Sequence, residues 1–577
     1  MLWCKNSIRD LAAMCRRWLA PGLAPILLIL AACSDQGVQT KASSSAQFAQ
    51  GQVVAPEEKQ VSYYAAARFL EQASFGPTPE SIERVRQLGF SAWIDEQLAM
   101  PYALLDGTEL REMYKLAPME IGLTRAQTNQ YFDFFEERFF EQILTSQAQL
   151  RLRTAWSLSQ FVTVACCSAV QPYAIVQYAN LLTSSAFGNY RQLLKDVTVS
   201  PPMGKFLDNE KNRPVSADCQ GCAPNENYAR ELMQLFSLGV TLLNADGSVV
   251  RDTKGKPMIS YTQEDVENLA RALTGWRFDG SWWTQPWTDS FNNASPMIPD
   301  PNENFHDSGS KVIFGKSIAA GGDARQDLEA LLDILMQHQN VAPFVALRMI
   351  QHLVTSDPSG AYISRIAAVF NDNGSGVQGD MAAVVKAILL DSEARRGDLP
   401  GSLDRRVGKV REPLLTHSAV LRGMGCVRLP RSNWDETRPA GSHPQRPFHA
   451  QNVFSFYLPT DRAPASGLLA PEQRLLTTDD IGSRLWKIRS FMPDDGDPFR
   501  RLDAAGCNFR EFVEAYERSP RELSSLTSSR FMRGAMPPTL RDTIETLAQD
   551  RSWDDQARQA ATAVSFAIAS PTFGVIR

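Results

Sequence analysis

Six polar side chains able to bind a ligand or transfer a proton lie within residues 225–231. They are Asn225, Glu226, Asn227, Tyr228, Arg230 and Glu231. If the segment is helical, Glu226 and Arg230 share one face because they are four residues apart. This spacing fits an exposed, ion-paired helix face. In the alternative, the segment is a polar site in which the two glutamates act as acid or base and the other four side chains bind the ligand.

A second cluster combines an imidazole, a carboxylate and an ammonium group: His306, Asp307 and Lys311. An imidazole beside a carboxylate can act as a general base, which makes His306 and Asp307 further catalytic candidates. Lys311 is a candidate ligand-binding residue. A structural hydrogen bond from His306 to a loop carbonyl is the other interpretation. The site hypothesis predicts that residues 225–231 face this cluster across a cleft, with a buried Arg230 paired to an acid.

Six of the nine cysteines remain once a secretory signal and a lipid-bearing Cys33 are set aside. An even number of cysteines outside the cytoplasm favours disulfide bonds, at least one of them involving Cys219 or Cys222. A four-sulfur zinc site or a redox-active Cys219–Cys222 pair is the alternative. We predict disulfides with open connectivity and no metal site. The six cysteines are Cys166, Cys167, Cys219, Cys222, Cys426 and Cys507.

Residues 1–32 have the features of a secretory signal. Arg16 and Arg17 precede a short apolar stretch that ends in Leu30-Ala31-Ala32-Cys33, which resembles the bacterial lipobox. Acylation of Cys33 predicts a membrane partner through a lipid anchor, in the cell envelope, with Ser34 favouring the outer membrane, on its periplasmic side or at the cell surface. A plain signal peptide with a chance cysteine is the alternative.

The charge balance argues against nucleic acid as a partner. The chain carries a net charge of −5, and residues 1–32 contain four cations and one acid, so the exported part is more acidic still. No basic stripe with interleaved aromatic residues occurs. Residues 33–60 are rich in Ser, Gln and Ala and poor in large apolar groups, which predicts a flexible tether.

The remaining sequence predicts a mainly α fold, a multi-helix globular body over residues 61–577 with long irregular loops and a small β-hairpin. Apolar residues recur at helical spacing through most of the chain. Thr78 and Pro79 mark one helix start, and Gly89 marks its end. The hairpin is expected at 240–250. Segments 277–324 and 427–475 are loop-rich, and long loops in compact domains are often functional.

Residues 62–577 resemble the bacterial family called domain of unknown function 1800. The most specific match is 224–239, which contains Asn225-Glu226-Asn227-Tyr228-Ala229-Arg230-Glu231. Other matching stretches follow in the expected order: 67–78, 261–266, 270–276, His306-Asp307 with Lys311, 338–343, 452–459 and 469–472. The resemblance implies export, a mainly helical fold and a secreted sulfatase-like companion protein. It implies no particular activity or cofactor, and the CxxC before Asn225 departs from the family pattern.

Two kinds of function remain open, and whether the chain is an enzyme is undecided. The first is a non-catalytic envelope protein that binds or assembles a partner or polymer at the cell surface, favoured by the lipid anchor and the missing catalytic signatures. The second is a hydrolase acting on envelope or extracellular polysaccharide. In that case the loop tryptophans Trp282, Trp283 and Trp287 would stack on sugar rings while the candidate acids and bases act on the glycosidic bond.

Overall fold

Polar caps at the helix starts fix many of the boundaries. Thr78 accepts a hydrogen bond from the backbone of Ser81 at the start of α4 (Pro79–Ala99), and Thr262 and Asp265 cap each other's backbone at the start of α12 (Gln263–Ala272). The chain breaks inside α4 at Gly89, where φ is +77°. The predicted helix end at Gly89 is therefore confirmed as a kink.

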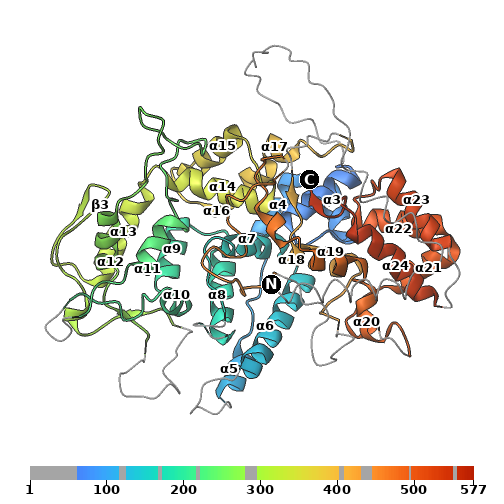
Figure 1. Cartoon of the computed structure of the whole chain (residues 1–577), viewed down its shortest axis with the longest axis horizontal. Helices are drawn as coiled ribbons and strands as arrows, with labels where there is room; N and C mark the ends of the chain where they lie inside the picture. The colour runs from blue at the N-terminus through green and yellow to red at the C-terminus, as the bar shows by residue number, and fades with distance from the viewer. Residues whose placement is uncertain are drawn as a thin grey trace, which may run out of the picture. The chain divides into compact units, whose positions relative to one another are not determined.

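The computed structural model describes residues 61–115, 125–166, 170, 172–215, 221–279, 295–401, 408–430, 445–464, 466–492, 496–549 and 555–577. Residues 58–577 group into one compact unit. Figure 1 shows its helices. The helices of the first half are α3 (Tyr63–Ala73), α4, α5 (Thr108–Lys115), α6 (Arg125–Thr145), α7 (Gln149–Ser159), α8 (Pro172–Ser185), α9 (Tyr190–Thr198), α10 (Pro201–Phe206), α11 (Glu226–Gln234) and α12.

The second half continues the helical pattern. Its helices are α13 (Ala324–Met336), α14 (Val341–Leu353), α15 (Gly360–Asn371), α16 (Met381–Leu390), α17 (Ser392–Arg395), α18 (Pro413–Gly423), α19 (Thr478–Leu485), α20 (Arg500–Ala504), α21 (Arg510–Arg518), α22 (Pro520–Phe531), α23 (Pro538–Gln549) and α24 (Gln556–Ala569). The predicted mainly α fold is confirmed. None of the helices in the described part is long and apolar enough to cross a membrane.

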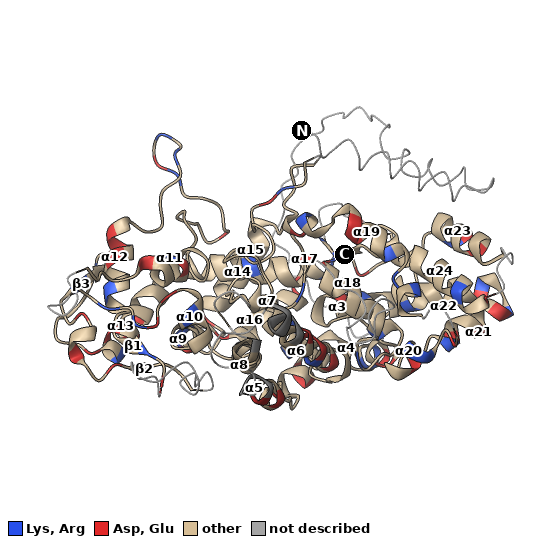
Figure 2. Cartoon of the chain, turned by 60° about the horizontal axis from the view of Figure 1, so that its bottom comes forward, with Lys and Arg blue, Asp and Glu red and all other residues tan. Residues whose placement is uncertain are grey.

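Strands are short and antiparallel. They pair as β1 (Trp276–Arg277) with β2 (Ile298–Pro299), β3 (Lys311–Ile313) with β4 (Lys316–Ile318), and β5 (Lys409–Val410) with β6 (Val575–Ile576). The predicted hairpin is present, because Leu243 bridges Val249 across the turn. A further bridge between Arg251 and Pro257 extends it into the arm that projects at the upper left of Figures 1 and 2.

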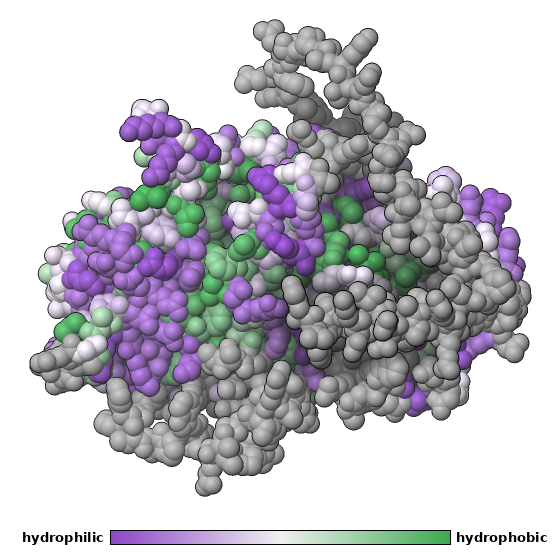
Figure 3. Space-filling view, viewed as in Figure 1, coloured by the Kyte–Doolittle hydropathy of each residue, from purple (hydrophilic) through white to green (hydrophobic). Residues whose placement is uncertain are grey.

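One continuous apolar core runs through the unit, from Phe69 on α3 to Ile576 on β6. Basic and acidic residues are scattered over many of the helices in Figure 2. Hydrophilic side chains gather over the end of the unit that contains α11, α12 and α13 (Figure 3).

Disulfide bonding, predicted from the cysteine count, is present. Cys426 and Cys507 are bonded to each other across 81 residues. Cys166 and Cys222 are also disulfide-bonded, whereas Cys33, Cys167 and Cys219 lie outside the described residues.

Candidate functional site

Backbone hydrogen bonds join three chain segments beside α12. The amide of Lys211 donates to the carbonyl of Trp276, and the amide of Gly275 donates to the carbonyl of Asn212, both at 2.8 Å. The amide of Asp300 donates in turn to the carbonyl of Gly275 at 2.8 Å. The β1–β2 pair, which places Trp276 opposite Pro299, continues the same layer. The side chains that project from these segments are therefore held by a fixed backbone frame.

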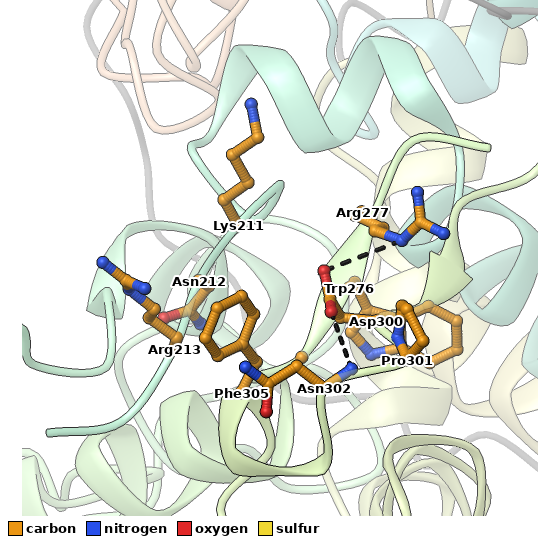
Figure 4. A pocket seen from close by; sticks show the side chains of 10 residues that line it. Lys211, Asn212, Arg213, Trp276, Arg277, Asp300, Pro301, Asn302 and Phe305 are labelled. Carbon is orange, nitrogen blue, oxygen red and sulfur yellow. Dashed lines mark hydrogen bonds and ion pairs between the residues drawn. The ribbon is translucent and has the colours of Figure 1, made fainter. Parts of the chain in front are cut away.

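These segments enclose a pocket of about 260 Å³. Ten residues line it, nine of them labelled in Figure 4: Lys211, Asn212, Arg213, Gly275, Trp276, Arg277, Asp300, Pro301, Asn302 and Phe305. Lys211, Pro301 and Asn302 are exposed, so the pocket opens to solvent along this side. Trp276 is buried, with 2% of its surface exposed, and belongs to the inner wall.

The pocket lining contains more positive than negative groups. Lys211, Arg213 and Arg277 contribute three cations, whereas Asp300 is the one carboxylate among the described lining residues. Arg277 Nε lies 3.6 Å from Asp300 Oδ2, a loose ion pair. Lys211 is paired at 3.1 Å with Glu210, a residue outside the lining. With Glu210 included, these groups are three cations and two carboxylates, and the remaining surplus of positive charge favours an anionic group in the pocket.

Aromatic groups supply the rest of the walls. The guanidinium carbon of Arg213 lies 5.0 Å from the centre of the Phe305 ring. In Figure 4 this ring stands between Arg213 and the Asp300–Arg277 pair. The indole Nε1 of Trp276 is buried and has no hydrogen-bond partner among the described residues.

Gly275 connects the pocket to His306. Its φ of +87° lies in the left-handed region, and a Cβ atom built on it would lie 2.9 Å from Cβ of His306. Any larger residue would push this histidine and the loop that carries Phe305 away from α12.

The loop that carries Phe305 is held in place by the side chains of His306, Asp307 and Lys311. His306 Nδ1 lies 2.9 Å from the carbonyl of Thr274, and Nε2 lies 3.2 Å from Oδ2 of Asp327. Both ring nitrogens therefore lie against polar groups of the protein itself, and His306 does not line the pocket. The structural interpretation of His306 is therefore the one that the geometry supports.

Asp307 and Lys311 complete this fastening. Asp307 accepts two hydrogen bonds from Arg271, at 2.7 and 3.1 Å. Burial raises the pKa of Asp307, but hydrogen bonds from Arg271 and the Gly309 amide outweigh it and hold the pKa below its usual value. The buried Nζ of Lys311 lies 2.5 Å from Asp327 and 2.8 Å from the carbonyl of Gly309. All three side chains are engaged within the protein.

Residues 225–231 form the N-cap and the first turns of α11. One hydrogen bond connects them to the pocket lining. Asn225 caps the helix, and its backbone amide donates to Oδ1 of Asn212 at 2.7 Å. Asn227 reaches Asp208 at 3.4 Å. The hydroxyl of the buried Tyr228 lies 2.7 Å from that of Thr198, inside the core.

The charged pair on α11 is exposed. Arg230 donates to Glu226 at 2.8 Å, and their side chains are 40% and 35% exposed. The expectation that Arg230 is paired is confirmed, whereas the expectation that it is buried is wrong, because this face of α11 meets solvent beside Gln263. A pair of this kind contributes under about 1 kcal/mol to stability.

Glu231 differs from its neighbours, because it is 9% exposed and its Oε2 is buried without a hydrogen-bond partner among the described residues. Burial raises its pKa, and the nearby Arg230 offsets part of that shift. Glu231, like Glu226, His306 and Asp307, does not line the pocket of Figure 4.

Each of the two predicted clusters contacts one lining residue of the pocket: Asn225 is hydrogen-bonded to Asn212, and His306 lies against Gly275. Asn212 and Gly275 are themselves joined by a backbone hydrogen bond of 2.8 Å, so they lie next to each other in the lining.

The residues that line the pocket are different ones. Phe305, Asp300 and Asn302 lie in the loop-rich segment 277–324. The sequence points to this segment, because long loops in compact domains are often functional. Lys211, Asn212 and Arg213 had no periodic or motif signal. Trp282, Trp283 and Trp287 lie outside the described residues.

The described residues contain no group of three or more His, Cys, Asp or Glu side chains arranged to hold a metal ion. No curated protein and no solved structure matches the chain. The sequence model of one family, described as protein of unknown function (DUF1800), matches residues 68–575, which is most of the chain. The chain therefore belongs to the DUF1800 family.

Proposed function

We propose that this chain is an exported, lipid-anchored protein of the bacterial cell envelope whose pocket binds an acidic group of a partner or polymer. The observation that carries the proposal is the lining of the pocket, which sets three cations against one carboxylate on a fixed backbone frame. Charged groups held in place in this way bind an anion without first having to be ordered. A secreted sulfatase-like protein, the companion that the family resemblance implies, is one proposed partner.

Binding is better supported than hydrolysis of a polysaccharide. Glycoside hydrolases generally need two carboxyl groups on either side of the scissile bond. Among the described residues that line the pocket, only Asp300 is a carboxylate, and it is paired with Arg277. The other acid candidates do not line the pocket: Asp307 is held by Arg271, Glu226 is held by Arg230, and Glu231 is buried.

The proposed attachment to the membrane depends on Cys33. Replacing Cys33 by Ser should release the protein from membranes, because acyl chains buried at about 0.8 kcal/mol per methylene are its proposed anchor. Fractionation of cells that express the wild type and the variant measures this, with Cys426→Ser as a matched control that removes a cysteine from the body of the protein. A Cys33→Ser protein that stays in the membrane fraction would contradict the lipoprotein proposal.

Binding of acidic polymers tests the pocket. The Cys33→Ser protein should bind polygalacturonate or polyglutamate and leave neutral dextran unbound, and Arg213→Gln should weaken that binding about tenfold, the equivalent of about 1.4 kcal/mol. Affinity electrophoresis in gels that contain each polymer measures the effect. Arg138→Gln is the control, because Arg138 lies on α6 and is partly exposed beside Glu141. Failure of both acidic polymers to bind, or equal binding by Arg213→Gln, would refute the proposal.

A further inference from the structure

We infer that the acidic group recognised by the pocket belongs to a sugar, and that the site holds one hexuronate ring. This inference rests on the proposed binding function and specifies its ligand class. It follows from the size of the pocket, from its aromatic wall and from the mixture of polar groups around that wall.

The size of the pocket limits the ligand to one ring. Its volume of about 260 Å³ lies below the range of about 300–1,000 Å³ that is typical for drug-sized ligands. The exposed rim at Lys211, Pro301 and Asn302 leaves room for neighbouring residues of a chain to extend into solvent. A single pyranose, free or within a polymer, therefore fits this opening.

The aromatic wall favours a ring over a simple anion. Phe305 is half-buried, and one side of its ring is covered by Arg213. In Figure 4 the ring lies between Arg213 and the Asp300–Arg277 pair. The C–H face of a pyranose can pack on such an aromatic surface. Phosphate and acetate have no comparable C–H face, so they would make no packing contact with the ring of Phe305.

The polar side chains of the pocket can bind both the hydroxyl groups and the carboxylate of a hexuronate. Asp300 accepts and Arg277 donates hydrogen bonds, so their pair can bind two adjacent hydroxyl groups. Asp300 also repels a second carboxylate, which directs the acid group of the sugar toward Arg213 and Lys211. An amino acid fits less well, because its ammonium group would meet three cations.

Calorimetric titration of the Cys33→Ser protein with sodium galacturonate, sodium glucuronate, galactose, acetate and phosphate tests the inference. We expect one of the two uronates to bind at least about tenfold more tightly than galactose, acetate or phosphate. Phe305→Leu should weaken uronate binding at least about fivefold, whereas Phe305→Tyr, which keeps the aromatic face, should retain it. Equal melting temperatures of the two variants would show that both are folded.

Tri-galacturonate distinguishes the two sources of the same sugar. Tighter binding of the trimer than of the monomer supports a residue within a polymer, and equal binding supports a free sugar acid; both results support the hexuronate assignment. Acetate or phosphate binding as tightly as the uronates would overturn it. So would binding of polyglutamate without binding of any uronate, a result that leaves the proposed function intact. Failure of every acidic polymer would instead overturn the proposed function.

Discussion

Replacing Glu71 by Ala should lower the free energy of unfolding by about 3–5 kcal/mol, because the change leaves two buried arginines without their shared carboxylate partner. Glu71 on α3 accepts hydrogen bonds from Arg411 at 2.7 Å and from Arg533 at 2.5 Å. The side chains of all three are at most 5% exposed. The triad joins the first described helix to the segments before α18 and after α22. The midpoint of denaturant unfolding, followed by circular dichroism, measures the loss.

The pH dependence of this loss has a definite sign. Burial would raise the pKa of Glu71, but Arg533 and Arg411 outweigh it and hold the pKa below its usual value. Its contribution is therefore complete above the unfolded pKa of about 4.3 and disappears as the pH falls through the folded pKa. The gap between wild type and Glu71→Ala should narrow in that acidic range. Glu83→Ala, which removes an exposed partner of Arg86, should cost under about 1 kcal/mol; equal losses in both variants would contradict this account.

Replacing Lys409 by Met should also cost about 3–5 kcal/mol, since it removes the cation between two buried carboxylates. Lys409 Nζ lies 2.7 Å from Oε1 of Glu412 and 3.4 Å from Oε1 of Glu472, and all three side chains are at most 1% exposed. Burial raises the pKa of Glu412, but Lys409 outweighs it and lowers the pKa to about 2. Methionine keeps the length of the side chain and removes its charge. Chemical denaturation at pH 7 measures the difference.

Lowering the pH should partly rescue the Lys409→Met variant. Without the ammonium group, burial raises the pKa of both carboxylates in the folded state, so the folded protein takes up protons before the unfolded one does. The deficit relative to wild type should therefore shrink between pH 7 and pH 5. Lys386→Met, which breaks an exposed pair with Asp95, serves as the matched control and should cost under about 1 kcal/mol at either pH. A deficit that grows toward pH 5 would count against the charge argument.

Helices with one exposed face and clear caps were predictable from the sequence. The start at Thr78 and the break at Gly89 are local features, and the structure confirms both. The capping box of Thr262 and Asp265 at the start of α12 is a local feature of the same kind. α18 has no comparable signal, because every one of its residues from Pro413 to Gly423 is buried and the sequence therefore lacks an apolar periodicity. α22 has a clear start signal in Ser519 and Pro520.

The pocket was less predictable than the helices. Residues 225–231 and His306 belong near it, yet their side chains serve the helix cap, the core and the attachment of the loop. The lining comes instead from three segments that are joined through backbone hydrogen bonds, and such bonds leave no pattern in side-chain types. For the same reason, the sequence did not indicate that Glu71 would meet Arg411 and Arg533.

The indole N–H signal of Trp276 offers the most direct test of binding in the pocket. The side chain lines the pocket, so a bound ligand should change its surroundings. In nitrogen-15 spectra of the Cys33→Ser protein, with the signal assigned through Trp276→Phe, titration with polygalacturonate should shift it saturably. Arg213→Gln should require more polymer for the same shift. A Trp276 signal that stays unchanged while the polymer is bound would place binding elsewhere and contradict the account.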